Sequence, residues 1–193
     1  MHELWISVER IEGACTSDHP MGLGTGFLIR NGRMHFPKGG PVCLFSLQSV
    51  LPMLTAKERI EDNDPTADWM ARVHHIQCPD PKGRVTWRME QRPMGSTQID
   101  TQMHIEPKSG DLKIVVERIE GRCNEGMQIG HWALLRGSSL FLAQPFCYYA
   151  MQAVLPMLPA MVRPLADGDW MASENAVICP DPLGNVVMRI KKV

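Results

Sequence analysis

A chain of 193 residues is long enough for one or two domains with buried cores, and its 44% apolar and 21% charged content is ordinary for a globular protein. The formal net charge of −1 lacks the basic surplus that nucleic-acid binders carry. The opening residues MHELWISVERIEG place charges inside their apolar run, so we expect no secretory signal; six cysteines without such a signal favour free thiols and a cytoplasmic location.

The first predicted elements are a strand and a hairpin. The segment ELWISVERI alternates, with Leu4, Ile6 and Val8 on one face, which is typical of a half-buried strand. In FLIRNGRMHF, Asn31 and Gly32 stand between two apolar runs. Both residue types tolerate a positive φ, so this pair predicts a tight hairpin turn.

A helix is predicted next, over CLFSLQSVLPML. Proline lacks an N–H group and crowds the preceding turn, so we expect Pro52 to end or kink this helix. The apolar residues with helical spacing should form its buried face. These residues are Cys43, Leu47, Val50, Leu51 and Leu54.

The last part of this segment predicts a turn and a second hairpin. Asp68 and Trp69 indicate a turn followed by a tryptophan in the core, although an exposed tryptophan here would suit a ligand anchor. The run ARVHHIQCPDPKGRVTWRMEQR predicts a strand, a tight turn rich in proline and glycine, and another strand.

The same order of elements then occurs a second time. VERIEGAC at 8–15 returns as VERIEGRC at 116–123, and QSVLPML, DWM and CPDPKG also have counterparts. The repeat predicts an α+β fold of two similar modules, 1–92 and 111–193, each an antiparallel sheet of hairpins with one helix. A polar linker over 93–110 joins them. Because one module alone buries little surface, we expect the two to pack as a pseudo-dimer. We expect the long apolar stretch within the second module to be buried core and not a membrane span, because it contains three prolines.

The cysteine order is similar to that of a known family. Cys15 before a glycine-containing loop, Cys43 leading a helix, and Cys78-Pro79-Asp80 before a final strand resemble an uncharacterised family of small prokaryotic proteins. These are about one module long, common in anaerobes, and end in a Cys-Pro-Asp signature. The resemblance covers both modules. It implies the fold unit and a prokaryotic, cytosolic setting, but no reaction. The family pattern has a Gly-Asp pair after the first cysteine, where this chain has Gly24-Thr25 and Gly130-His131.

The six cysteines are the main candidates for chemistry. Three thiolates per module can ligate zinc or an iron–sulfur cluster, the two cofactors this set would suit. Close Cys-x-x-Cys pairs are absent, however, so we favour cysteines packed as small apolar residues over a metal site. Cys43 and Cys147 also begin predicted helices, where a thiol pKa can fall, yet both lie on apolar faces. The matched pairs are Cys15 with Cys123, Cys43 with Cys147, and Cys78 with Cys179.

Four other residues are weaker candidates. His74 and His75 precede Cys78 and can act as bases or ligands, but the second module lacks them, and a strand with one histidine on each face is the simpler interpretation. Asp80 and Asp181 can act as paired general acids across a pseudo-twofold axis. We favour the alternative that each caps its own turn.

These observations leave two hypotheses for function. The first is a non-catalytic binding or accessory protein, a fused pseudo-dimer that partners a larger enzyme subunit or binds a small molecule at the module interface. The second is a cysteine-dependent metal-binding or redox enzyme of anaerobic metabolism. We expect neither nucleic acid nor a membrane as a partner, and further association of chains is left open.

Overall fold

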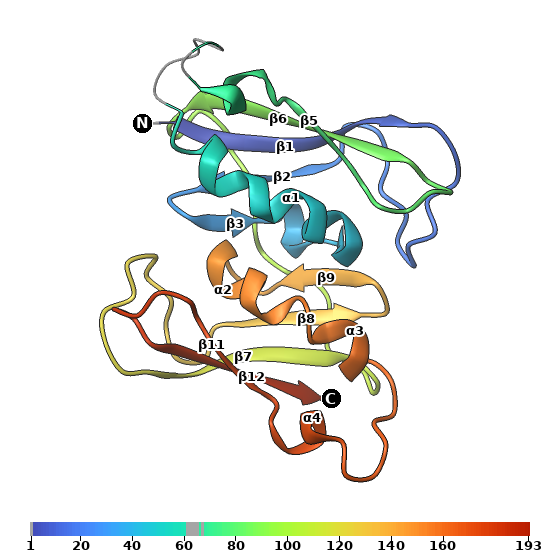
Figure 1. Cartoon of the computed structure of the whole chain (residues 1–193), viewed down its shortest axis with the longest axis vertical. Helices are drawn as coiled ribbons and strands as arrows, with labels where there is room; N and C mark the ends of the chain where they lie inside the picture. Colours follow the sequence, from blue (N-terminus) through green and yellow to red (C-terminus); the bar gives the residue numbers. More distant parts are fainter. Residues whose placement is uncertain (1, 61–65, 67) are drawn as a thin grey trace.

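Two antiparallel sheets of six strands each, one above the other, form the frame of this α+β protein (Figure 1). The computed structural model describes residues 2–60, 66 and 68–193. The strands of the first half are β1 (His2–Ile11), β2 (Gly26–Arg30), β3 (Arg33–His35), β4 (Val42–Cys43), β5 (His75–Gln77) and β6 (Val85–Pro93). Those of the second half are β7 (Leu112–Ile119), β8 (Trp132–Arg136), β9 (Ser139–Leu142), β10 (Phe146–Cys147), β11 (Ala176–Ile178) and β12 (Val186–Lys192).

The first strand of each half alternates as predicted. Leu4, Ile6 and Val8 of β1 are all buried, and the corresponding residues of β7, Leu112, Ile114 and Val116, are buried too. The hairpin turn at Asn31-Gly32 is also confirmed. Strands β2 and β3 pair on either side of it, and both turn residues have a positive φ, of 49° and 66°.

The first helix, α1 (Leu44–Lys57), starts where the sequence predicts, with Cys43 at its N-cap. It does not end at Pro52, because helical residues continue to Lys57. Leu47, Val50, Leu51 and Leu54 on its inner face are all fully buried. We attribute the continuation to the burial of apolar side chains on both sides of the proline, which offsets the roughly 3 kcal/mol that an interior proline costs.

The second half differs from the predicted single helix. In its described residues the helical segment is divided into α2 (Tyr148–Val154) and α3 (Leu158–Met161), with α4 (Trp170–Ser173) further along the chain. The division falls next to Pro156, as predicted. A second proline, Pro159, occupies the first turn of α3, where its missing N–H would have no helical partner anyway.

Each sheet takes one of its two edge strands from the other half of the chain. The order is β10-β3-β2-β1-β6-β5 in the first sheet and β11-β12-β7-β8-β9-β4 in the second. Val42 of β4 therefore pairs with Leu140 of β9, and Phe146 of β10 pairs with Met34 of β3. The exchange is thus reciprocal, because the first half gives β4 to the second sheet and the second half gives β10 to the first. The buried apolar residues of both halves accordingly form one continuous core.

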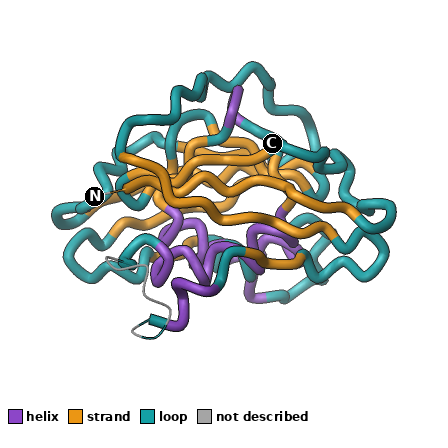
Figure 2. Tube along the Cα trace, turned by 90° about the horizontal axis from the view of Figure 1, so that it is seen from above, coloured by secondary structure: helices purple, strands orange, loops and turns teal. Residues whose placement is uncertain are grey.

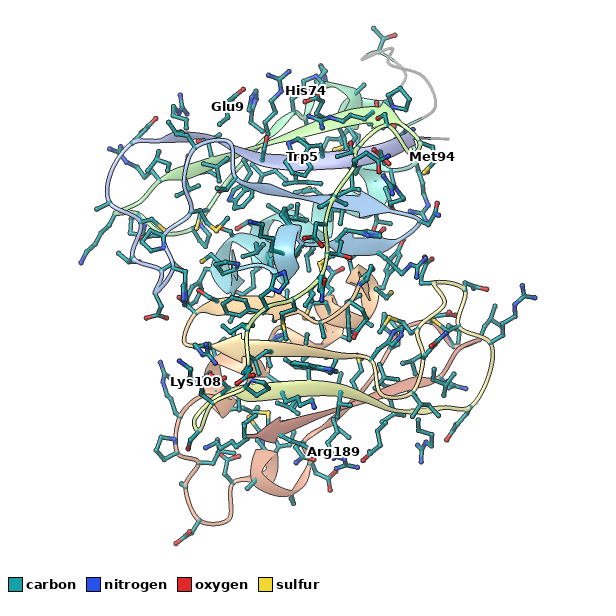
Figure 3. All side chains as sticks on the ribbon, turned by 180° about the vertical axis from the view of Figure 1, so that it is seen from behind. Trp5, Glu9, His74, Met94, Lys108 and Arg189 are labelled. Atoms are coloured by element: carbon teal, nitrogen blue, oxygen red, sulfur yellow. The ribbon has the colours of Figure 1, made fainter. Side chains whose placement is uncertain are left out.

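The two faces of the sheets are covered differently. The α-helices lie on one face, and α1 and α2 meet where the halves join (Figures 1 and 2). The linker crosses the opposite face from Met94 to Lys108 (Figure 3). It has no strand or helix of its own beyond Pro93, and its Asp100 carbonyl accepts a hydrogen bond from the backbone N–H of Lys38.

The tryptophan of each Asp-Trp pair is not a core residue. Trp69 is 58% exposed and Trp170 is 63% exposed, so the predicted core position is wrong. The preceding aspartates determine this orientation, because Asp68 and Asp169 each accept a hydrogen bond from the backbone N–H two residues on and so cap a short helical turn. Across the described residues, no helix has the length and apolar character needed to cross a membrane.

Candidate functional site

A cleft of about 820 Å³ opens where the two halves meet. We call it the interface cleft. Its lining comes from both halves, because the first contributes Asn31, Glu58 and Arg59, and the second contributes Glu125 and Tyr149. The hairpin turn at Gly32 forms part of the wall. Gly32 has a φ of 66°, which favours glycine, and a Cβ atom there would force the end of the Glu125 side chain to move.

Arg59 is held in place at the edge of the cleft by its neighbours. Its Nη1 donates a hydrogen bond of 2.8 Å to the carbonyl of Thr55, one turn earlier. Hydrogen bonds with Tyr149 and then Tyr148 raise the pKa of Arg59, so the guanidinium stays charged. The hydroxyl of Tyr148 donates to Glu58 Oε2 at 2.8 Å. The cleft therefore presents a fixed cation beside a fixed carboxylate.

Glu125 is the half-buried carboxylate of the cleft. Burial raises its pKa above the ordinary value, and the negative charge of Glu58 raises it further. Arg33 and Arg59 act in the opposite direction without cancelling the rise. The ionised form of a carboxyl group in such a position is stabilised by a ligand that brings a positive charge or a hydrogen-bond donor.

Next to this cleft lies a second cavity of about 380 Å³, which we call the thiol pocket. Cys123, Cys147 and Cys179 line it, together with Asp181. Its remaining lining includes residues that also line the interface cleft, namely Arg59, Asn124, Glu125 and Tyr149, so the two spaces are contiguous. The tertiary structure therefore brings all three cysteines of the second half to one cavity.

Two of these thiols are in hydrogen-bond contact. The hydrogen bond from the Cys147 thiol lowers the pKa of Cys179 to about 7, against the opposing effect of burial. The backbone N–H of Asp181 contributes to the same decrease. The contact with Cys179, together with burial, raises the pKa of Cys147. Cys179 is thus the sulfur on which a thiolate forms first.

The first half buries its cysteines in the same pattern but gives one of them a different partner. Cys15, like Cys123, is half-buried, and Cys43 and Cys78, like Cys147 and Cys179, are buried within the core. Burial raises the pKa of Cys78, and the thiol hydrogen-bonds to the hydroxyl of Ser46. The position equivalent to Ser46 in the second half is Ala150, which has no hydroxyl to offer. This single difference changes the partner available to the matched cysteine.

All six cysteines are free thiols. Within the described part of the chain, no group of three or more His, Cys, Asp or Glu side chains is arranged to hold a metal ion. The zinc or iron–sulfur site therefore has no preformed geometry in support.

Asp80 and Asp181 each bond within their own turn. Asp80 Oδ1 accepts from the backbone N–H of Lys82 at 2.9 Å, and Asp181 Oδ1 accepts from that of Leu183 at 3.0 Å. These are the turn-capping bonds expected of aspartate at such positions. Asp80 also accepts hydrogen bonds from the backbone and the hydroxyl of Thr16, whereas Asp181 faces the thiol pocket.

The histidine pair lies on the surface. His75 Nε2 of β5 is 2.6 Å from Glu9 Oε2 of β1, an exposed contact that reaches across the intervening strand β6. His74 is exposed as well and lines a separate cavity of about 330 Å³ beside Lys57 and Gln91. Neither histidine lines the interface cleft or the thiol pocket.

Sequence reasoning missed the residues that give the interface cleft its charge. These lie where the two copies of the repeat differ. Glu125 corresponds to Ser17, Tyr149 to Phe45, and Glu58 to Val162. Residues that are the same in both copies belong to the shared core. Polar residues that occur in only one copy, next to a matched cysteine or helix, indicate a role of that half alone. This contrast between the copies is the signal that could have identified the site.

Comparison with protein-family models, with curated proteins and with solved structures finds no match to this chain. The resemblance to the small prokaryotic family therefore stays a prediction, based on the order of the cysteines and the Cys-Pro-Asp segment.

Proposed function

We propose that this chain is a non-catalytic binding protein, built as a fused pseudo-dimer, and that the interface cleft takes a small polar molecule with a cationic group such as a primary amine. The observation that carries the proposal is the cleft itself. Its walls come from both halves, so a binding site forms only when the whole chain is folded.

The charge of the lining favours a cationic ligand. The interface cleft and the thiol pocket together are lined by three carboxylates, Glu58, Glu125 and Asp181, against one arginine, Arg59. Arg59 is already engaged with Thr55 and the two tyrosines, whereas Glu125 is destabilised as an anion. A ligand ammonium group beside Glu125 would relieve this repulsion, and the face of Tyr149 offers a further contact for a cation.

The duplication supports binding over catalysis. The repeated residues are those of the core and the turns, and no matched set of acid, base and nucleophile is repeated with them. The location in the cytoplasm and the pairing with a larger enzyme subunit remain part of the proposal. The thiol pocket favours the second candidate, a cysteine-dependent redox function, because it brings three cysteines to one cavity.

A panel of matched small molecules tests the binding proposal. Thermal unfolding is followed with 1,4-diaminobutane and with succinate, which have the same chain length and opposite charge. We expect the diamine to raise the midpoint of unfolding, since a ligand at about 100 times its Kd adds about 2.7 kcal/mol to stability. Stabilisation by succinate and not by the diamine would contradict the assignment.

Two variants locate the site. Glu125→Gln should abolish the effect of the diamine, because the amide keeps the size of the side chain but loses its charge. Glu106→Gln, an exposed residue of the linker outside both cavities, is the matched control and should bind as the unmodified chain does. Titration calorimetry gives the affinity of each variant directly.

A further inference from the structure

The cysteines of the second half have an arrangement that a purely structural role does not require. Cys147 is the last residue of the exchanged strand β10, and Cys179 follows directly after β11. Their thiols are in hydrogen-bond contact, and although both are buried members of the core, both also line the thiol pocket. Each of these thiols therefore has the other as a partner sulfur, and the cavity gives a third sulfur, from an external compound, access to them.

The first half supplies an internal comparison. Cys43 and Cys78 occupy the matched positions, but Cys78 hydrogen-bonds to the hydroxyl of Ser46. Because Ala150 replaces Ser46 in the second half, the Cys179 sulfur takes its hydrogen bond from Cys147 instead. The two halves therefore share a core but differ in the partner of one sulfur.

We infer that Cys147 and Cys179 form a redox-active dithiol that reduces small disulfide compounds entering the thiol pocket. The inference depends on the two sulfurs and on the space beside them. It does not depend on which ligand the interface cleft binds.

The positions of the two sulfurs assign their roles. Cys179 is the attacking sulfur, because the hydrogen bond from the Cys147 thiol lowers the pKa of Cys179 and so favours its thiolate, whereas the same contact and burial raise the pKa of Cys147. Cys147 is the resolving sulfur. It is 3% exposed, against 7% for Cys179, and its pKa is raised, so it reacts with the adjacent mixed disulfide in preference to an external one. Its backbone N–H donates to the sulfur of Met127 at 3.3 Å, which helps to fix its place in the pocket wall.

The reaction consumes one disulfide, R–S–S–R′, and yields two thiols. The Cys179 thiolate attacks one sulfur, the S–S bond of the compound breaks, and R′S⁻ leaves with the electron pair. R′S⁻ takes the proton of the Cys147 thiol. The Cys147 thiolate then attacks the Cys179 sulfur, a Cys147–Cys179 disulfide forms, and RS⁻ leaves and is protonated by water with the proton that Cys179 had released. The protein is oxidised by two electrons, and the compound is reduced by two.

Oxidised glutathione is a suitable probe of the whole chain. The reduced protein is incubated with it, the remaining thiols are blocked by alkylation, and the digest is analysed by mass spectrometry. We expect a peptide crosslinked between Cys147 and Cys179, release of two equivalents of glutathione and loss of two titratable thiols per chain. Cys43 and Cys78 should remain alkylated. Rate constants should rise with pH around 7, as the Cys179 thiolate forms.

Single substitutions separate the steps. Cys147→Ser should accumulate a mixed disulfide of glutathione on Cys179, whereas Cys179→Ser should react at least tenfold more slowly. The matched variants Cys43→Ser and Cys78→Ser should still form the crosslink, and circular dichroism verifies that each variant is folded. The inference is overturned if the unmodified chain holds glutathione on Cys179 without forming the crosslink, if it does not react, or if the crosslink joins other cysteines. Each of these results leaves the test of amine binding unaffected.

Discussion

The buried Glu3 and the half-buried Arg30 form an ion pair that attaches the start of the linker to the first sheet. Arg30 Nε donates to Glu3 Oε2 at 2.7 Å, and the same carboxylate accepts the backbone N–H groups of Gly95 and Thr97. Asp111 and Arg136 repeat the arrangement at the other end, where Arg136 also donates to the carbonyl of Glu106. A linker without regular structure is thus held at both ends by one buried acid and one arginine.

The Glu3 pair predicts a specific loss of stability in acid. Burial alone would raise the pKa of Glu3, but hydrogen bonds from Arg30, Thr97 and Gly95 outweigh it and lower the pKa from 4.5 to about 2. The stabilisation is therefore complete above the ordinary pKa of 4.5 and is lost as the pH falls towards 2. A shift of this size corresponds to about 3 kcal/mol. Urea unfolding between these pH values measures it.

Substitution identifies the residue responsible for that pH dependence. Glu3→Gln should lower the free energy of unfolding at neutral pH by about 3 kcal/mol and flatten its dependence on pH below 4.5. Glu120→Gln is the control, because Glu120 forms an exposed pair with Arg118 and should change stability by no more than about 0.5 kcal/mol. If the stability of Glu3→Gln falls below pH 4.5 as steeply as that of the unmodified chain, the ion pair is not the source of the loss in acid.

The raised pKa of Glu125 predicts the opposite dependence of stability on pH. Burial and the nearby Glu58 raise its pKa, so the folded protein disfavours the ionised form. Its contribution to stability is present at low pH and is lost as the pH rises through the raised pKa. Glu125→Gln should therefore unfold at a higher temperature than the unmodified chain at pH 7, with no difference at low pH. A lower melting temperature at pH 7 would mean that Glu125 has a stabilising partner in the folded state.

Truncation of Leu47 should strongly lower the free energy of unfolding. It is fully buried on the inner face of α1, so Leu47→Ala should cost about 2–5 kcal/mol in the free energy of unfolding. Phe45, on the same helix but 44% exposed, is the comparison, and Phe45→Ala should cost much less. Equal losses in denaturant melts would mean that the buried face of α1 is wrongly assigned.

The exchange of β4 and β10 predicts that neither half is stable alone. Produced separately, residues 1–92 leave β4 without its partner β9, and residues 111–193 leave β10 without β3. Each fragment should lack a cooperative thermal transition as a monomer, because the shared core is divided. The two mixed together should restore it, with a one-to-one complex in size-exclusion chromatography. A well-dispersed amide NMR spectrum from either monomeric fragment would contradict this.

Much of the local structure was predictable from the sequence because it depends on neighbouring residues. Alternation at Leu4, Ile6 and Val8 predicted a strand buried on one face, Asn31-Gly32 predicted the hairpin turn, and the helix begins at Cys43 as expected. The same reasoning failed at Pro52 and Trp69. At Pro52 packing against the core overrides the local preference, and at Trp69 the cap formed by Asp68 turns the side chain outwards.

The sequence by itself determined the two copies, the alternating strands, the turns and the starts of the helices, because periodicity and turn chemistry act over a few residues. Only the tertiary structure decided which half completes each sheet, which charges meet in the interface cleft, and which thiols touch. Those outcomes join residues far apart in the chain. Cys147 meets Cys179 while Cys78 hydrogen-bonds to Ser46, although the cysteines themselves are matched. Packing of the halves against each other, together with the few positions at which the copies differ, selects these contacts.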